Sequence, residues 1–73
     1  MANNTQRYRY KGLIVEVSRI SDLPGGFGVY HCLVRGFGHN NPLPRKAYNI
    51  HASTNAQASR KALIKYEEDG KEN

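Results

Sequence analysis

Few side chains in this sequence have a type and spacing suited to catalysis or metal binding. The imidazole and thiol groups belong to His31, Cys32, His39 and His51, and no two of them stand at a metal-ligand spacing such as Cys-x-x-Cys. His31 and Cys32 are adjacent in a strand-like segment, so they point to opposite faces and cannot pair as base and nucleophile. Because cysteine is so often buried, we predict that Cys32 is a core residue. We therefore expect no catalytic residues, no metal site, no cofactor and no enzymatic activity.

The basic side chains are more informative. In a DNA major groove, which admits a short β-sheet, Arg can bind guanine with two donors and Asn can bind adenine in a similar way. Near the start of the chain, basic residues alternate with Tyr8 and Tyr10, a pattern suited to holding phosphates and stacking on bases. The candidate nucleic-acid-binding residues are Arg7, Arg9, Lys11, Arg35, Arg45 and Asn49.

Charge is unevenly distributed along the chain. The 11 Lys and Arg residues and the 6 Asp and Glu residues give a formal net charge of +5. Residues 1–65 hold ten Lys or Arg and two acids, a net charge of +8, whereas residues 66–73 hold one Lys and four acids, a net charge of −3. A basic body attracts polyanions. The expected partner is therefore nucleic acid, with duplex DNA favoured, or an acidic protein surface.

A second group of side chains indicates a different function. Val29 and Leu33 fall on the strand face that also carries Arg35, and Ile64 falls on the far side of the predicted helix. Apolar residues stranded on exposed faces are typical of a protein interface. The alternative is thus a protein-interaction module, such as a phage or mobile-element inhibitor of a host factor, or a subunit of a homodimer. Its candidate residues are Val29, Leu33, Phe37 and Ile64, together with the loop 36–44.

Period-two alternation predicts three strands, and helical spacing predicts one helix after them. The strands are expected at residues 7–20, 27–37 and 45–52, separated by a Pro-Gly-Gly turn and by a loop rich in Gly and Pro. Thr54 and Gln57 form a capping box, from which the helix runs towards Gly70. The predicted fold class is α+β, a three-stranded antiparallel sheet with one C-terminal helix packed on one face. We expect a disordered arm at residues 1–6, a single domain at 7–67 and a flexible acidic tail at 68–73.

Alternation also predicts which side chains face the helix. In the third strand, Tyr48 and Ile50 are the expected core pair, whereas Asn49 and His51 point the other way. In the first strand, the face of Tyr8 and Tyr10 depends on Gly12. A bulge at this glycine would bring the two tyrosines to the side of the following apolar residues, and without a bulge they stand on the opposite face.

The order of elements resembles that of the AP2-type DNA-binding domain and of the amino-terminal arm-binding domain of tyrosine integrases. The matching stretch is Gly26–Tyr66, in which the residues Ala-Ser-Thr-Asn-Ala-Gln-Ala at 52–58 are similar to the helix start of those domains. The resemblance implies that Arg35, Arg45 and Asn49 contact DNA from the sheet. Those domains carry tryptophans on the sheet, whereas this chain has none. Double-stranded-RNA-binding domains and the HicB-type antitoxin fold share the same outline.

The length of 73 residues allows one domain. A chain of this size buries only roughly 60% of the surface that its unfolded form exposes, so small domains often add a disulfide, a metal or a second subunit. Cys32 is the single cysteine, which excludes an intrachain disulfide and leaves self-association open. Residues 1–6 lack the apolar run of a signal peptide, and no segment approaches a membrane-spanning length. We expect a cytoplasmic protein that does not contact a membrane.

Overall fold

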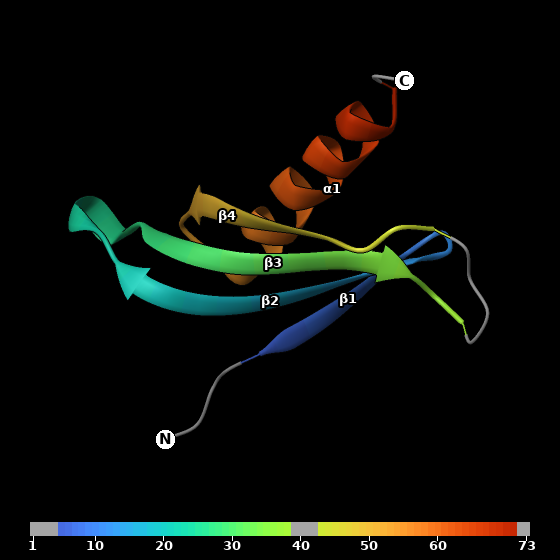
Figure 1. The fold of residues 1–73 in the computed structure, drawn as a ribbon. Helices are drawn as coiled ribbons and strands as arrows, with labels where there is room; N and C mark the ends of the chain where they lie inside the picture. Colours follow the sequence, from blue (N-terminus) through green and yellow to red (C-terminus); the bar gives the residue numbers. More distant parts are fainter. Residues whose placement is uncertain (1–4, 39–42, 72–73) are drawn as a thin grey trace.

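The computed structural model describes residues 5–38 and 43–71, which form one antiparallel sheet and one long helix. In chain order the elements are β1 (Gln6–Tyr10), β2 (Leu13–Asp22), the single 3-10 turn η1 (Pro24–Gly26), β3 (Gly28–Gly36), β4 (Lys46–Ala52) and α1 (Asn55–Lys71). The strands lie side by side in chain order, and α1 crosses one face of the sheet (Figure 1). The predicted α+β class and the packing of the helix are confirmed, but the sheet has four strands instead of three.

The additional strand arises because the chain reverses at Lys11 and Gly12. Tyr10 pairs with Leu13 across this two-residue connection, so the stretch predicted as one strand is a hairpin of β1 and β2. Gly12 adopts a φ of 81°, a left-handed conformation that glycine tolerates far better than other residues. The backbone N–H of Phe37, just beyond β3, donates to the Gly12 carbonyl at 2.8 Å. The reversal, and not a bulge, places the tyrosines of β1 on the side of the helix.

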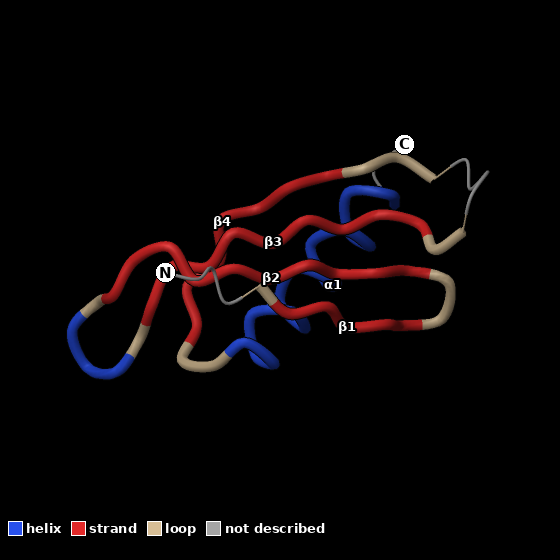
Figure 2. The backbone as a smooth tube through the Cα atoms, turned by 90° about the horizontal axis from the view of Figure 1, so that it is seen from below, coloured by secondary structure: helices blue, strands red, loops and turns tan. Residues whose placement is uncertain are grey.

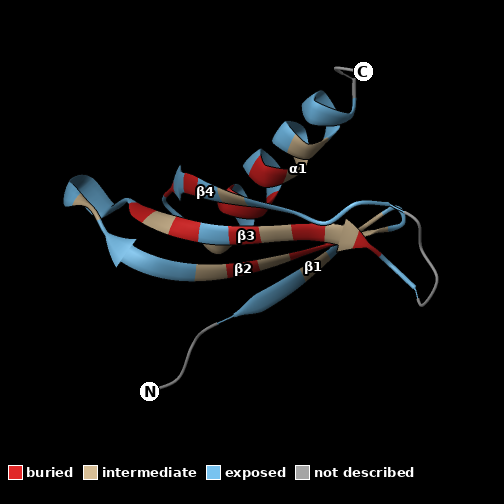
Figure 3. Cartoon of the chain, in the orientation of Figure 1, coloured by how far each residue is buried: buried red, intermediate tan, exposed pale blue. Residues whose placement is uncertain are grey.

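The core lies between the sheet and α1, and it follows from alternation in β2, β3 and β4. Val15 and Val17 of β2 and every second residue of β3 from Gly28 to Gly36 are buried (Figure 3), whereas residues 19–22 at the end of β2 are exposed. Ile50 on β4 is only 3% exposed, whereas its neighbours Asn49 and His51 are exposed, as predicted. The buried core residues are Val15, Val17, Tyr30, Cys32, Val34, Ile50, Ala52, Ala58 and Ala62. Cys32 is therefore a core residue, in agreement with the prediction.

Helix α1 begins with the predicted capping residues. The Thr54 hydroxyl accepts a hydrogen bond from the backbone N–H of Gln57 at 3.1 Å, which satisfies one free amide of the first turn. The Gln57 side chain reaches back one residue further than a capping box requires, because its oxygen accepts the backbone N–H of Ser53 at 2.8 Å. In the next turns, Ala58 and Ala62 are fully buried, and their small side chains allow the helix backbone to approach the sheet.

The end of α1 is tied to β4 and to the segment before it. The Tyr48 hydroxyl donates to the Asp69 carboxylate at 2.7 Å, and the Tyr66 hydroxyl donates to the Pro44 carbonyl at 2.8 Å. The Lys46 ammonium group lies 3.8 Å from the same Asp69 carboxylate. Residues 68–71, which the sequence assigned to a flexible tail, therefore belong to the helix. Of the arm expected at residues 1–6, Gln6 belongs to β1, and residues 1–4 lie outside the described residues, as do the last two residues of the tail.

Candidate nucleic-acid interface

The sheet face opposite α1 is the one on which the predicted binding residues gather. Seen from below, the four strands lie in front of the helix, and no other element of the described chain covers them (Figure 2). The register places the residues of this open face in rows that run across the strands. The rows are Arg9, Ile14 and Arg35; then Arg7, Glu16, Leu33 and Ala47; then Ser18, His31 and Asn49; then Val29 and His51.

Three predicted residues meet at one end of the open face, since Arg7 and Arg9 come from β1 and Arg35 comes from β3. Neighbouring residues within a row are about 5 Å apart, so the three arginines form one cluster. Arg45 is exposed and directly precedes β4, where an extension of the register would place it beside Arg35. Asn49 shares the face but lies two rows further along. Lys11 is exposed in the turn between β1 and β2, at the arginine end of the sheet.

A single carboxylate joins two of these three arginines. One oxygen of Glu16 accepts hydrogen bonds from Arg7 Nε at 3.1 Å and from Arg35 Nη2 at 3.4 Å. The three arginines and the one glutamate leave a net charge of +2 within two adjacent rows. The Arg7 side chain is 70% exposed, and the described residues take only its Nε–H, so both terminal amino groups stay available to a ligand. Exposed ion pairs of this kind contribute little stability, and their value here is to hold the guanidinium groups side by side.

Arg9 is positioned differently from Arg7, on an aromatic ring. Its guanidinium group lies 4.7 Å from the ring centre of Phe37, a cation–π contact between the first strand and the end of the third. Ile14 lies between Arg9 and Arg35 in the register and is only 8% exposed, although it is on the open face. The aliphatic parts of long arginine side chains can cover an apolar residue in this way. Phe37, which the sequence grouped with a protein interface, thus belongs to the arginine cluster.

The two tyrosines of β1 lie on the other face of the sheet and do not join this cluster. Alternation along β1 turns Tyr8 and Tyr10 towards the helix when Arg7 and Arg9 face away. Tyr10 packs against the core, and its hydroxyl lies 2.7 Å from the hydroxyl of Ser59 on α1. The two-residue reversal at Gly12 sets the register that turns the tyrosines towards the helix and the arginines towards the open face.

The apolar residues predicted for a protein interface lie on two different surfaces. Val29 and Leu33 are half-buried on the open face, and Phe37 lies at the arginine end of that face. Ile64 is 55% exposed on α1, on the opposite side of the sheet, next to β4. A single flat partner could not cover all four of these residues. The alternative site is therefore divided into an open-face part and a helix part.

Other chemistry has little support in the described residues. No three His, Cys, Asp or Glu side chains gather in residues 5–38 and 43–71 closely enough to hold a metal ion. Burial raises the pKa of the Cys32 thiol to about 11, so the thiol is protonated and unreactive at neutral pH. The described part of the chain also has no helix with the length and apolar character needed to span a membrane.

Comparison with protein-family models, with curated proteins and with solved structures finds no match for this chain. The resemblance to AP2-type and integrase arm-binding domains is therefore untested and stays a prediction. What the structure itself defines is a small α+β protein in which a helix covers one face of a four-stranded sheet. The other face carries an arginine cluster built on one glutamate and one phenylalanine.

Proposed function

We propose that this protein binds nucleic acid, in the first place duplex DNA, through the open face of its sheet. The observation that carries the proposal is that Arg7 and Arg35 share the carboxylate of Glu16 on an uncovered sheet face, with Arg9 in the adjacent row of the same face. Guanidinium groups bind phosphate oxygens with two parallel hydrogen bonds, and a cluster of them attracts a polyanion from a distance.

The exposure of the arginines suggests which residues contact phosphates and which contact bases. Arg7 and Arg9 are the more exposed and lie on the outermost strand, so they serve as phosphate contacts that position the sheet. Arg35 is held by Glu16 nearer the middle of the face. Arg45 and Asn49, both exposed and next to or on β4, are the groups placed to reach base edges. This division gives the two sets of residues different effects on binding.

The test is a fluorescence-anisotropy titration of duplex DNA and of RNA at about 50 mM and about 200 mM salt. If Arg7 and Arg9 each neutralise a phosphate, the variant Arg7→Ala/Arg9→Ala should reduce the slope of log K against log salt concentration for duplex DNA by about two. Arg45→Ala should cost about 1–3 kcal/mol at a preferred sequence if this residue reads a base. Arg60→Ala is the control, because Arg60 is exposed on α1, which covers the other face.

Two results would overturn the proposal. One is the absence of binding to either nucleic acid at low salt. The other is an equal loss in the Arg60→Ala variant and in the variants of the open face, because this result would mean that total charge and not the arginine cluster determines binding.

A second candidate function rests on the apolar residues of the same face. Val29 and Leu33 are only half-buried, and with the exposed Phe37 ring they place three apolar side chains among the polar and basic residues of the open face. A protein partner with an acidic rim would use both features, as expected for an inhibitor of a host factor. For this function, Leu33→Asp should abolish binding and moderate salt should not. In nucleic-acid binding, salt should have the larger effect.

A further inference from the structure

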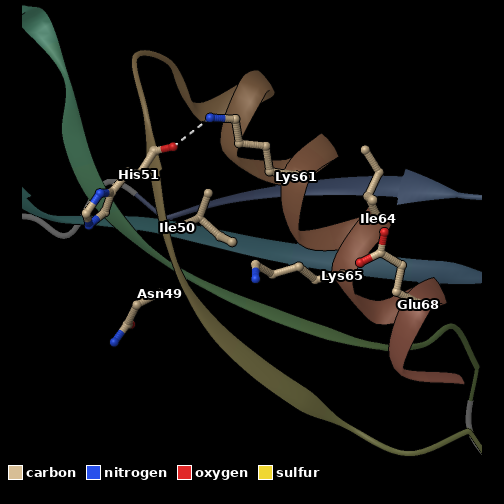
Figure 4. Close-up of a pocket in the computed structure, with 7 residues that line it drawn as sticks. All are labelled: Asn49, Ile50, His51, Lys61, Ile64, Lys65 and Glu68. Atoms are coloured by element: carbon tan, nitrogen blue, oxygen red, sulfur yellow. Dashed lines mark hydrogen bonds between the residues drawn. The ribbon is translucent and has the colours of Figure 1, made fainter. Parts of the chain in front are cut away.

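The outer edge of β4 carries backbone groups that no neighbouring strand of the described chain pairs. β4 is the last strand of the sheet and pairs with β3 alone. The His51 carbonyl accepts the Lys61 ammonium group at 2.9 Å, so the backbone of His51 points out of the sheet (Figure 4). Because backbone direction alternates along an antiparallel strand, the N–H and C=O groups of Ala47 and Asn49 also point outwards. Natural proteins protect such edges with proline, bulges or charge, and the seven residues of β4 contain neither a proline nor a bulge.

A groove runs between this edge and the flank of α1. Its volume is about 470 Å³, and residues of both elements line it (Figure 4). The helix contributes Lys61, Ile64, Lys65 and Glu68, at spacings that put all four on one stripe. Lys65 and Glu68 form no ion pair with the described residues, although both carry charge, and Ile64 is largely exposed. The stripe is thus an apolar residue flanked by unpaired charges of both signs.

This stripe is complementary to itself. When two copies of α1 are laid antiparallel about a twofold axis between Ile64 and Lys65, each Lys61 faces the Glu68 of the other copy, and each Ile64 faces the stem of Lys65. The strand edges obey the same symmetry. With the axis at Asn49, each Ala47 lies opposite the His51 of the other copy, and all outward backbone groups find partners. His51 is bonded to Lys61 and Tyr48 to Asp69, so Asn49 lies opposite the middle of the helix stripe and one axis can serve both elements.

We infer that the edge of β4 and the stripe Lys61/Ile64/Lys65/Glu68 are the interface through which two copies of this chain form a symmetric dimer. The two sheets join into one continuous sheet of eight strands, with both helices on the same face and both arginine clusters on the other. A contact that uses the same patch twice closes on itself and does not propagate into a fibre. A second subunit also suits a small domain with no disulfide. The inference does not depend on nucleic-acid binding.

The first test measures mass against concentration by sedimentation equilibrium on nuclease-treated protein. The wild type should rise from 8.2 kDa towards twice that mass. Ala47→Pro should stay monomeric with an unchanged circular dichroism spectrum, because the N–H that it removes points out of the sheet. Ala47→Val keeps this N–H and should still dimerise. A wild type that stays at 8.2 kDa up to about 1 mM, or a proline variant that dimerises like the wild type, would overturn the inference.

A charge exchange provides the second test, and it does not depend on the fold tolerating proline. Lys61→Glu and Glu68→Lys each replace two attractions across the axis with two repulsions, and each should weaken dimerisation about tenfold. The double variant Lys61→Glu/Glu68→Lys restores both pairs and should return to within about threefold of the wild type. A double variant that dimerises no better than the single variants would contradict the twofold pairing.

Discussion

The hydrogen bond between Tyr10 and Ser59 offers a direct test of the fourth strand. The Ser59 side chain is completely buried on α1, and its hydroxyl donates to the Ala56 carbonyl at 2.7 Å. Since this bond uses the only proton of the serine hydroxyl, the Tyr10 hydroxyl must be the donor in the 2.7 Å contact with Ser59. The contact joins β1 to the helix across 49 residues of sequence. It exists only if β1 folds back with its tyrosines towards the core.

The expected magnitudes follow from which groups lose a partner. Tyr10→Phe removes a donor and leaves Ser59 bonded to Ala56, so it should cost about 0.5–1.5 kcal/mol. Ser59→Ala leaves the part-buried Tyr10 hydroxyl without a partner, at a cost of about 1–3 kcal/mol, less about 0.5 kcal/mol for the better helix propensity of alanine. Each single variant already lacks the Tyr10–Ser59 hydrogen bond, so the double variant loses this bond only once. The double-mutant cycle should therefore give a coupling energy of about 1 kcal/mol.

Urea unfolding of the wild type, both single variants and the double variant measures this coupling. Tyr8→Phe is the matched control, because the Tyr8 hydroxyl on the same strand donates to the Gln6 side chain and not to the helix. Its coupling to Ser59→Ala should be close to zero. A Tyr10–Ser59 coupling below about 0.3 kcal/mol, within the range of independent sites, would show that β1 does not dock as described. The placement of Arg7 and Arg9 on the open face would then fail with it.

Two further predictions concern the core and its response to pH. Ile50→Ala should destabilise the protein by about 2–4 kcal/mol because it leaves a cavity in the core. Asn49→Ala should cost well under 1 kcal/mol. Shifts of similar size in the thermal midpoints of the two variants would contradict the register of β4. Stability should also fall in alkali. Burial raises the pKa of the Cys32 thiol from 9.0 to about 11. Burial, and to a smaller extent the hydrogen bond to Asp69, raises the pKa of the Tyr48 hydroxyl from 10.0 to about 12. The folded state then retains protons that the unfolded chain releases, so stability is complete below pH 9 and declines as pH rises towards 12. Tyr48→Phe should remove the upper part of this decline in urea titrations between pH 8 and 12, and an unchanged profile would contradict the assignment.

The strands and the helix start were predictable because their signals are local. Alternation over residues 45–52 distinguishes Ile50 from Asn49 without any knowledge of the partner strand. Thr54 and Gln57 mark the helix start through hydrogen bonds that span only a few residues. The end of the helix was not predictable in this way. The macrodipole disfavours acids in the last turn, but Asp69 accepts the Tyr48 hydroxyl from a strand 21 residues away in sequence.

The fourth strand was missed because two structures leave the same mark on the sequence. A bulge at Gly12 and a reversal at Gly12 both shift the alternation of apolar residues by one position, so that the tyrosines of β1 match the apolar residues of β2. A bulge continues one long strand, whereas a reversal adds an edge strand that must pack against α1. The contact that decides between them is the one from Tyr10 to Ser59, which no local pattern contains.

The same ambiguity determined how much of the candidate site could be predicted. The sequence identified the arginines and placed Arg7 and Arg9 in a strand over residues 7–20, but it left open which face of the sheet this part of the strand presents. Once β1 is a strand paired with β2, alternation forces Arg7 and Arg9 onto the face of Glu16 and removes the tyrosines from it. The glutamate then lies between Arg7 and Arg35, which are 28 positions apart in sequence. The charge cluster is thus a consequence of one reversal at Gly12, and a nucleic-acid interface that depends on it should lose its arginine pairing whenever β1 detaches from β2.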